Sequence, residues 1–351
     1  MPARKERTMS SLYGKSEEEL IEELELEKKY QARQIRSWLV KGARSFEEMS
    51  DLPLKDRKRL SESGKKVISS HIRDQQIDKS AHKLLIELED GALIECVMLW
   101  DKTGRKTACI SSQVGCAMGC AFCKTGTMGL VRNLADYEII EQIVHLRTLD
   151  PAIGHIVFMG MGEPLNNLGA LMRAVTCFHA PDMFNISYRK MTVSTCGYVP
   201  GIRSLSELDL GIRLAVSLVS AEDETRSRIM RINRTYPLGE LKKALLAFQH
   251  AGEKRITLEY CMLSGVNTSS KSAKALANFI TGLSAVVNLI PWNKVEGLDF
   301  ESPSAEEIRK FTNDLDHLHI NYTLRMPKGR GISGACGQLA TSTKRKPKAE
   351  K

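Results

Sequence analysis

The sequence has no long hydrophobic run and no apolar stretch near its start. None of its apolar segments approaches the ~18 residues that a membrane-spanning helix needs, which excludes an integral membrane protein. The opening residues, Met1-Pro-Ala-Arg-Lys-Glu-Arg, are not followed by the apolar core of a secretory signal, so we expect a cytoplasmic protein. A disordered chain is excluded as well, because 42% of the 351 residues are hydrophobic.

The nine cysteines lack the arrangement of a disulfide framework. Their number is odd, and the expected compartment is reducing. Metal ligation or thiol chemistry is therefore the better interpretation, and the spacing of the cysteines decides between them.

Positive charge is concentrated at one end of the chain. The formal net charge is +9, and the segment 325–351 holds eight basic residues against one acidic residue, Glu350. A basic strip of this kind suits RNA or DNA, whereas a solvated tail kept for solubility explains the same charge equally well. Charge alone leaves both readings open.

The length predicts two domains, and the patterns along the chain suggest where they lie. Residues 1–80 read as a small helical domain, beginning at Ser16 with acidic residues in the first turn. Residues 81–104 read as a β-hairpin linker with a turn at Asp90-Gly91. Strands and amphipathic helices alternate over 105–340, and we expect the tail 341–351 to be basic and disordered.

The alternating region predicts an α/β fold built on a parallel sheet. The candidate strands are 107–111, 155–159, 191–195, 212–218, 255–261 and 286–291, with a closing strand at 320–325. Right-handed crossovers curl such a sheet toward a barrel, but six βα units fall short of the eight of a full barrel. We therefore expect a partial (β/α)6 barrel.

Three closely spaced cysteines follow the first barrel strand. They are Cys116, Cys120 and Cys123, in the pattern C-x₃-C-x₂-C, where the catalytic loops of βα barrels lie. An iron–sulfur cube needs four ligands, and no fourth cysteine stands nearby, so one iron would stay open to a small molecule. A zinc site would need a fourth ligand at a paired spacing that the sequence does not offer. Three structural thiols by chance is the remaining, less favoured interpretation.

A glycine-rich turn with a carboxylate, Gly160-Met-Gly162-Glu163-Pro164, follows the second strand. It is weak evidence for a phosphate site, because the rest of a dinucleotide fingerprint is missing. A carboxylate beside glycine at a strand end suits an ammonium group instead, since the backbone can approach closely there.

Two further thiols and one carboxylate are candidates for chemistry. Cys336 lies between glycines inside the basic strip, which favours an exposed, mobile thiol. Cys109 lies on the first barrel strand and by itself reads as a small buried hydrophobe, although a pair of thiols near one cluster can alternate as nucleophile and resolving partner. Glu95 shares a strand face with Leu93 and Val97, which indicates either an exposed sheet edge or a buried general base.

Taken together and in order, these motifs resemble the RlmN/Cfr family of radical S-adenosylmethionine RNA methyltransferases. Besides the cysteine triplet, Gly-Met-Gly-Glu-Pro and Ala-Cys-Gly-Gln-Leu, the resemblance includes Ser194-Thr-Cys-Gly and Asn288-Leu-Ile-Pro-Trp-Asn293. It runs from about residue 10 to residue 340.

The resemblance implies a role for each matching position. Cys116, Cys120 and Cys123 would hold one [4Fe–4S] cluster per chain. Cys336 would become an S-methylcysteine intermediate, Cys109 would resolve it through a transient disulfide, and Glu95 would accept a ring proton. The positions implied to contact S-adenosylmethionine, two molecules of which are consumed per turnover, are Gly162, Glu163, Ser194, Ser217, Leu218, Val219 and Asn293.

The resemblance also implies substrates and partners. The leading hypothesis is methylation of adenosine C2 in the peptidyl-transferase centre of 23S rRNA and beside the anticodon in tRNA, by a monomer that touches no membrane. Because no electron-carrier domain is visible in the sequence, a separate donor such as flavodoxin is expected. The alternatives are C8 methylation of 23S rRNA, which gives antibiotic resistance, and an iron–sulfur RNA-binding redox protein without methyl transfer. A radical enzyme that activates another protein is a third alternative.

Three positions depart from the family pattern. Val219 replaces a common histidine, and Arg231 stands where proline is usual. The segment Gly331-Ile-Ser-Gly-Ala before Cys336 differs from the usual Asp-Ile-x-Ala-Ala. The change at Val219 affects one implied cofactor contact, and the altered segment before Cys336 affects how that thiol can move.

Overall fold

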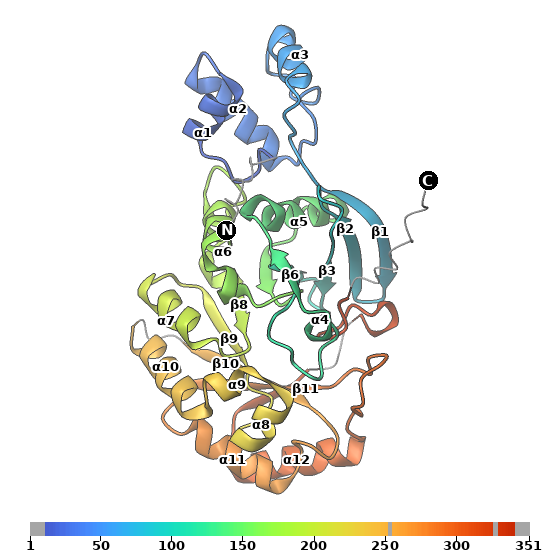
Figure 1. The fold of residues 1–351 in the computed structure, drawn as a ribbon, viewed down its shortest axis with the longest axis vertical. Helices are drawn as coiled ribbons and strands as arrows, with labels where there is room; N and C mark the ends of the chain where they lie inside the picture. The colour runs from blue at the N-terminus through green and yellow to red at the C-terminus, as the bar shows by residue number, and fades with distance from the viewer. Residues whose placement is uncertain (1–10, 252–254, 326–328, 341–351) are drawn as a thin grey trace, which may run out of the picture.

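The computed structural model describes residues 11–251, 255–325 and 329–340. Three helices form a module at the N-terminal end, drawn in blue in Figure 1: α1 (Glu17–Leu24), α2 (Lys29–Val40) and α3 (Leu54–Glu62). Helix α1 begins at the predicted Ser16, whose hydroxyl accepts the Glu19 N–H at 3.1 Å while the Glu19 carboxylate accepts the Ser16 N–H at 2.7 Å. Ile35 and Leu39 of α2 belong to the apolar core shared with the rest of the chain.

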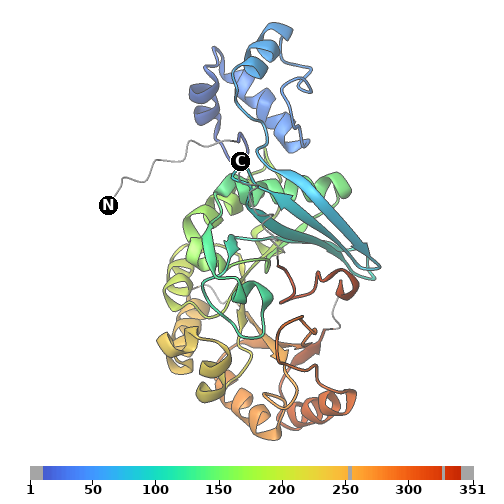
Figure 2. The same ribbon diagram turned by 45° about the vertical axis from the view of Figure 1, so that its right-hand side comes forward.

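A ten-stranded sheet carries the remainder of the chain. Its strands from β4 to β12 are all parallel and follow the order of the sequence, whereas β1, β2 and β3 extend one edge as antiparallel neighbours. Figure 2 shows the sheet curving around the centre of the molecule. The strands are β1 (His71–Asp78), β2 (Ala81–Glu87), β3 (Leu93–Trp100), β4 (Lys106–Cys109), β7 (His155–Phe158), β8 (Met191–Thr195), β9 (Arg213–Ser217), β10 (Ile256–Met262), β11 (Ala285–Pro291) and β12 (Tyr322–Leu324).

The partial barrel predicted from the sequence is confirmed. Among the described residues, the outermost strands β1 and β12 each pair with a single neighbour, so the barrel stays open. The expectation of a helical module as far as residue 80 is wrong at its end, because His71–Asp78 is strand β1. Its sequence HIRDQQID is mostly exposed and lacks the apolar alternation that marks a strand.

The hairpin predicted at 81–104 exists as β2 and β3, but it is part of the sheet. Strand β3 pairs with the first barrel strand, with Val97 opposite Cys109. A second, two-stranded sheet of β5 (Gln113–Gly115) and β6 (Leu130–Asn133) was not predicted, because its strands are too short to show a period. The division of the chain into separate domains remains a prediction, and the tail 341–351 lies outside the described residues.

Helices cover the outer face of the curved sheet (Figures 1 and 2). None that the structure describes is both long and apolar enough to cross a membrane. The longer ones are α5 (Asp136–Leu149), α6 (Leu168–His179), α7 (Val199–Glu207), α10 (Leu238–His250), α11 (Ser270–Ile280) and α12 (Ala305–His317), and the short ones are α4 (Lys124–Thr127), α8 (Asp223–Ile229) and α9 (Ile232–Thr235).

Helix α5 joins the N-terminal module to the barrel through buried polar side chains. The carboxylate of Glu141 accepts the backbone N–H groups of Ser69 and Ser70 at 2.8 and 2.9 Å. The amide of Gln142 accepts the Ser111 N–H at 2.7 Å and donates to the Ser111 carbonyl at 3.0 Å, just beyond the end of β4. Because buried polar groups are costly when unpaired, these contacts fix how the two parts meet.

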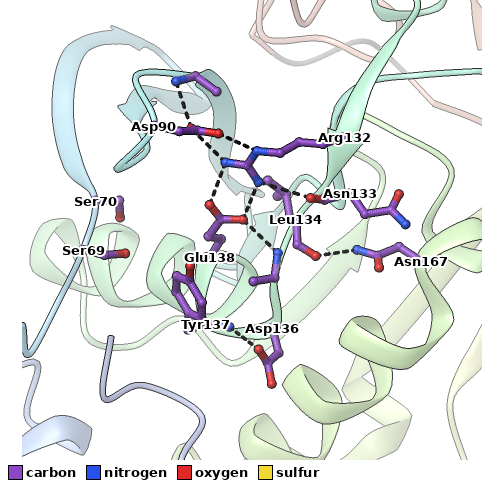
Figure 3. Close-up of polar contacts among 12 residues, drawn as sticks. Ser69, Ser70, Asp90, Arg132, Asn133, Leu134, Asp136, Tyr137, Glu138 and Asn167 are labelled. Atoms are coloured by element: carbon purple, nitrogen blue, oxygen red, sulfur yellow. Dashed lines mark hydrogen bonds and ion pairs between the residues drawn. The ribbon is translucent and has the colours of Figure 1, made fainter. Parts of the chain in front are cut away.

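An arginine on β6 ties the small sheet to the hairpin turn and to α5 (Figure 3). The Arg132 guanidinium lies 2.7 Å from the Asp90 carboxylate and 2.7 Å from the Glu138 carboxylate. Glu138 also accepts the Ala135 N–H at 2.8 Å, at the start of the helix. Since β5 and β6 flank the cysteine loop, this ion-pair network holds both ends of the loop against the barrel.

Candidate active site

A pocket opens at the carboxyl ends of the parallel strands, on the inner side of the barrel. It contains ten of the residues proposed from the sequence: Cys116, Cys120, Cys123, Gly162, Glu163, Ser194, Ser217, Val219, Asn293 and Cys336. We call it the barrel pocket. The chain therefore brings the three triplet cysteines, most of the implied cofactor contacts and the proposed methyl carrier into one cavity.

The cysteine loop is closed at its base by backbone contacts. Cys116 follows β5, and its N–H donates to the Gly129 carbonyl at 2.9 Å. Gly115 has a φ of +75°, and a Cβ at this position would lie 2.0 Å from the Gly129 oxygen. Glycine is required here, because any side chain would push the two ends of the loop apart.

The three thiols lie in an environment that suits a cluster. Burial raises the pKa of Cys116 to about 11, although the Met118 N–H opposes this shift. Burial likewise raises the pKa of Cys123 against hydrogen bonds from Gly126 and Thr125. Backbone N–H groups aimed at the sulfurs are the neighbours that a coordinated thiolate needs.

The donor set fits an iron–sulfur cluster better than a single ion. Among the described residues, no three Cys, His, Asp or Glu side chains are grouped closely enough to hold one metal ion. A four-iron cluster places each thiolate on a different iron, so its ligands stand farther apart than those of one ion. The apolar side chains of Met118, Phe122 and Trp292 share the wall of the pocket. Three thiols and an apolar wall therefore match the group implied by the sequence.

The carboxylate of Glu163 lies buried where β7 ends, and backbone groups fix both of its oxygens. One oxygen accepts the Cys196 N–H at 2.8 Å and the other accepts the Leu165 N–H at 3.1 Å. Burial raises the pKa of Glu163 above its ordinary value. Gly162 beside it has a φ of +104°, and a Cβ there would lie 2.5 Å from the Gln113 side chain. This geometry is suited to receiving an ammonium group at close range.

A fully buried arginine holds the ends of β8 and β9 together. The Arg226 guanidinium donates to the Cys196 carbonyl at 2.7 Å and to the Leu218 carbonyl at 3.0 Å, and it reaches the Asn233 side chain at 2.8 Å. Leu218 is completely buried and is not among the residues that line the barrel pocket. Its backbone N–H donates to the Glu259 carbonyl at 3.0 Å, so the structure does not bring Leu218 to the surface of the pocket.

Val219 stands in a strained conformation next to Leu218. Its φ is +58°, which is rare for a β-branched residue, and it is buried. The Asn267 side chain donates to the Val219 carbonyl at 2.6 Å and to the Cys261 carbonyl at 2.7 Å, which holds the turn in place. This backbone conformation is costly for valine, so the surrounding contacts hold the turn in place.

Cys336 lies on a segment that is tied to the cysteine loop. The Lys124 N–H donates to the Gly337 carbonyl at 2.8 Å, and the Thr125 hydroxyl donates to the Leu339 carbonyl at 2.6 Å. Cys336 is exposed to the solvent of the pocket, as its glycine setting predicted. The surrounding protein desolvates its thiolate and raises the pKa of Cys336, while Arg325 lowers it.

Cys109 and Glu95 are not among the described residues that line the barrel pocket. Cys109 is buried on β4, where desolvation and then the charge of Cys336 raise its pKa, so the two thiols lie within electrostatic range. Glu95 is buried on β3 rather than at an exposed edge, and Lys83 holds its carboxylate at 2.9 Å. The second Glu95 oxygen accepts the Ala340 N–H at 2.9 Å, on the same segment as Cys336.

Several polar residues that were not predicted from the sequence also line the pocket. Glu259 and Cys261 stand two apart on β10 and both line the cavity, which the period of a strand could have indicated. Arg325 lines it from the end of β12, although we counted it only as part of the basic strip. The side chains of the strip's other basic residues, from Lys328 onward, lie outside the described part of the structure.

The fold and site define a radical S-adenosylmethionine enzyme. The Radical SAM superfamily matches residues 110–274, from the first barrel strand to α11. Proteins of this superfamily use a [4Fe–4S] cluster and S-adenosylmethionine. The crystal structure of a radical SAM methyltransferase from Sphaerobacter thermophilus is similar to this chain with a TM-score of 0.89 and 38% identity, over 94% of this chain and 98% of that one.

Two relatives of similar sequence identify the family within this superfamily. The probable dual-specificity RNA methyltransferase RlmN of Treponema pallidum (strain Nichols) is 41% identical over 94% of this chain and 97% of its own length. The dual-specificity RNA methyltransferase RlmN of Anaeromyxobacter dehalogenans is 42% identical over 90% of this chain and 87% of its own length. The chain therefore belongs to the RlmN family of radical SAM RNA methyltransferases.

Proposed function

We propose that the protein methylates C2 of adenosine in 23S rRNA and in tRNA, in the cytoplasm, by way of an S-methylcysteine on Cys336. The observation that carries the proposal is that Cys336 opens into the same pocket as the three loop cysteines and the Glu163 carboxylate. A thiol that must meet both a methyl donor and an RNA base needs such a shared cavity. The relatives' dual specificity supports the choice of two RNA substrates.

Cys116, Cys120 and Cys123 would hold the cluster, which supplies the electron that splits S-adenosylmethionine into methionine and a 5′-deoxyadenosyl radical. Glu163 would bind the methionine ammonium group. The remaining contacts would come from Gly162, Ser194, Ser217, Val219 and Asn293, which all line the pocket. Two molecules of S-adenosylmethionine would be used per turnover, one for the methyl group and one for the radical.

The chain's own residues would then act in sequence. The Cys336 thiol loses its proton and takes the methyl group of the first S-adenosylmethionine. After loss of one hydrogen atom, the methyl carbon of Cys336 bonds to adenine C2. Glu95 accepts the proton that leaves C2, and the unpaired electron of the adduct passes to a one-electron acceptor. The Cys109 thiolate attacks the Cys336 sulfur, and the sulfur–carbon bond breaks with its electron pair going to the base, whose carbon takes up a proton to become the methyl group. A separate thiol reductant then supplies two electrons and returns the Cys109–Cys336 disulfide to two thiols.

Glu95 is hydrogen-bonded to the segment that carries Cys336, which links the two residues in this scheme. Ala340 donates to Glu95, and Cys336 lies four residues earlier on the same segment. A movement of this segment that carries Cys336 toward the base would also free one oxygen of Glu95. We therefore expect proton acceptance and methyl delivery to be coupled through the segment 335–340.

The experiment is nucleoside mass spectrometry of rRNA and tRNA from a host that lacks its own enzyme and expresses this chain. We expect 2-methyladenosine in both RNAs and none with Cys336→Ala. Cys177→Ala, at a buried cysteine of α6 away from the pocket, is the matched control and should keep the product. 8-Methyladenosine in rRNA would overturn the position, and no product from the cluster-loaded wild-type chain would overturn the activity.

A further inference from the structure

The outer side of the cysteine loop carries a second cavity. We call it the loop groove. It shares only Cys116 and Cys120 with the barrel pocket among the residues that line them. Its lining residues come from the cysteine loop, from α4 and the turn after it, and from the α8–α9 corner. They are Cys116, Ala117, Gly119, Cys120, Ala121, Gly126, Thr127, Gly129, Arg228 and Arg231.

The loop and the α8–α9 corner are in direct contact. The Ala121 N–H donates to the Ile229 carbonyl at 2.9 Å. The Arg231 side chain lies over Gly119, where a Cβ would be 3.3 Å from its Cδ. The groove is therefore a built surface, which rigid backbone contacts hold beside the cluster ligands.

Two arginines give the groove its charge. Arg228 and Arg231 are both exposed, and no acidic side chain is among the lining residues. Within the described ranges, no carboxylate of the chain lies within 4.0 Å of either guanidinium. Unpaired, exposed guanidinium groups favour an anionic partner.

The position of the groove distinguishes between anionic partners. A target base must enter the barrel pocket, where Cys336 and the inner side of the loop lie. The groove reaches the same cysteines from the opposite side, so a partner there would approach the cluster without obstructing the base. Electrons can cross such a wall of protein, whereas a base or a methyl group cannot. A one-electron carrier is therefore the anionic partner that could act on the cluster from this side.

We propose that the loop groove is the docking site of the separate electron donor, a small acidic flavoprotein. This inference rests on the proposed function, which requires one electron from outside the chain. In the docked complex the reduced flavin loses one electron and the cluster gains it. Electron-transfer encounters use small, weak interfaces that are steered by charge, which two arginines on a shallow groove can provide.

The test uses cluster-loaded protein and purified flavodoxin. Arg228→Glu/Arg231→Glu is compared with Arg189→Glu/Arg309→Glu, which changes the net charge equally at exposed arginines on other elements that do not line the groove. We expect the first variant to weaken flavodoxin binding in calorimetry by about tenfold or more at low salt. The difference should shrink at about 1 M salt, where the Debye length falls to about 3 Å.

Cluster reduction and RNA binding are measured on the same variants. Reduction by flavodoxin should slow in the groove variant, while reduction by dithionite and affinity for tRNA should match the control. Unchanged flavodoxin binding, equal weakening in the control, or a loss of tRNA affinity alone would each overturn the docking site. Because flavodoxin binding is read without RNA, a chain that fails to methylate RNA but shows the expected binding pattern would refute only the proposed function.

Discussion

Lys83 allows the Glu95 carboxylate to remain charged inside the protein. Replacing Lys83 by an uncharged residue therefore tests this buried ion pair through the free energy of unfolding. The two side chains are 9% and 6% exposed, and Lys83 Nζ lies 2.9 Å from Glu95 Oε1. Lys83→Met leaves the carboxylate buried with the Ala340 N–H as its remaining partner. Breaking a buried pair in this way costs about 3 kcal/mol, so we expect the free energy of unfolding at pH 8 to fall by that amount.

The loss should depend on pH with a defined sign. Burial raises the pKa of Glu95, and Lys83 opposes the shift, so removing Lys83 raises the pKa further. Below that pKa the native variant takes up a proton that the unfolded chain, with an ordinary glutamate, does not bind. The destabilisation is therefore complete above the variant's pKa and shrinks as the pH falls toward about 4.5.

Urea unfolding at pH 8 and pH 5.5 measures this effect directly. Lys83→Met/Glu95→Gln is the control, because it leaves no buried charge and should recover most of the loss. If Glu95 is the proton acceptor, the acid limb of the pH–rate profile of methylation should also move to higher pH in Lys83→Met. A loss below about 1 kcal/mol, or an equal loss at both pH values, would refute the reasoning.

Two further predictions concern the loop and the joint between module and barrel. Gly115→Ala should lower the iron content of reconstituted protein severely, because its Cβ would meet the Gly129 oxygen at 2.0 Å. Gly64→Ala is the control, because Gly64 also has a positive φ (+73°) but nothing lies within 4 Å of its Cβ position; equal iron in both variants would contradict the account. Burial and then Arg44 lower the pKa of His145 to about 3, so the unfolded chain binds a proton below pH 6.5 that the native state does not. Stability should therefore fall by about 1 kcal/mol between pH 7 and pH 5.5, and His145→Gln should remove this part of the slope in urea titrations; an unchanged slope would show that His145 is not the group responsible.

The sequence predicted the barrel well because most of its strands are short segments rich in apolar residues that alternate with amphipathic helices. Met191–Thr195 matches its predicted bounds, and the other barrel strands differ from theirs by a few residues at their ends. Strand β1 escaped because its residues are polar on both faces. The short strands β5 and β6 are held by the loop closure at Gly115 and by the Arg132 ion pairs, which depend on partners distant in sequence.

The candidate site was predictable where its residues lie in short motifs. The cysteine triplet and Gly162-Glu163 follow strand ends, and parallel strands bring such ends to one edge. The partners of Glu95 were not predictable, because Lys83 reaches it across β2 and β3 and Ala340 comes from the far end of the chain. Glu259 and Cys261 were overlooked although their alternation on a predicted strand pointed inward.

The central claim is that Cys336 bonds covalently to the RNA base and that Cys109 releases it. The most direct measurement is mass spectrometry of RNA-bound peptides after reaction of the Cys109→Ala variant with tRNA. The account predicts that a peptide containing Cys336 carries an adenosine joined through one extra carbon, and that wild-type protein carries far less of it. Free 2-methyladenosine from Cys109→Ala at the wild-type rate, with no adduct on Cys336, would contradict the two-thiol scheme.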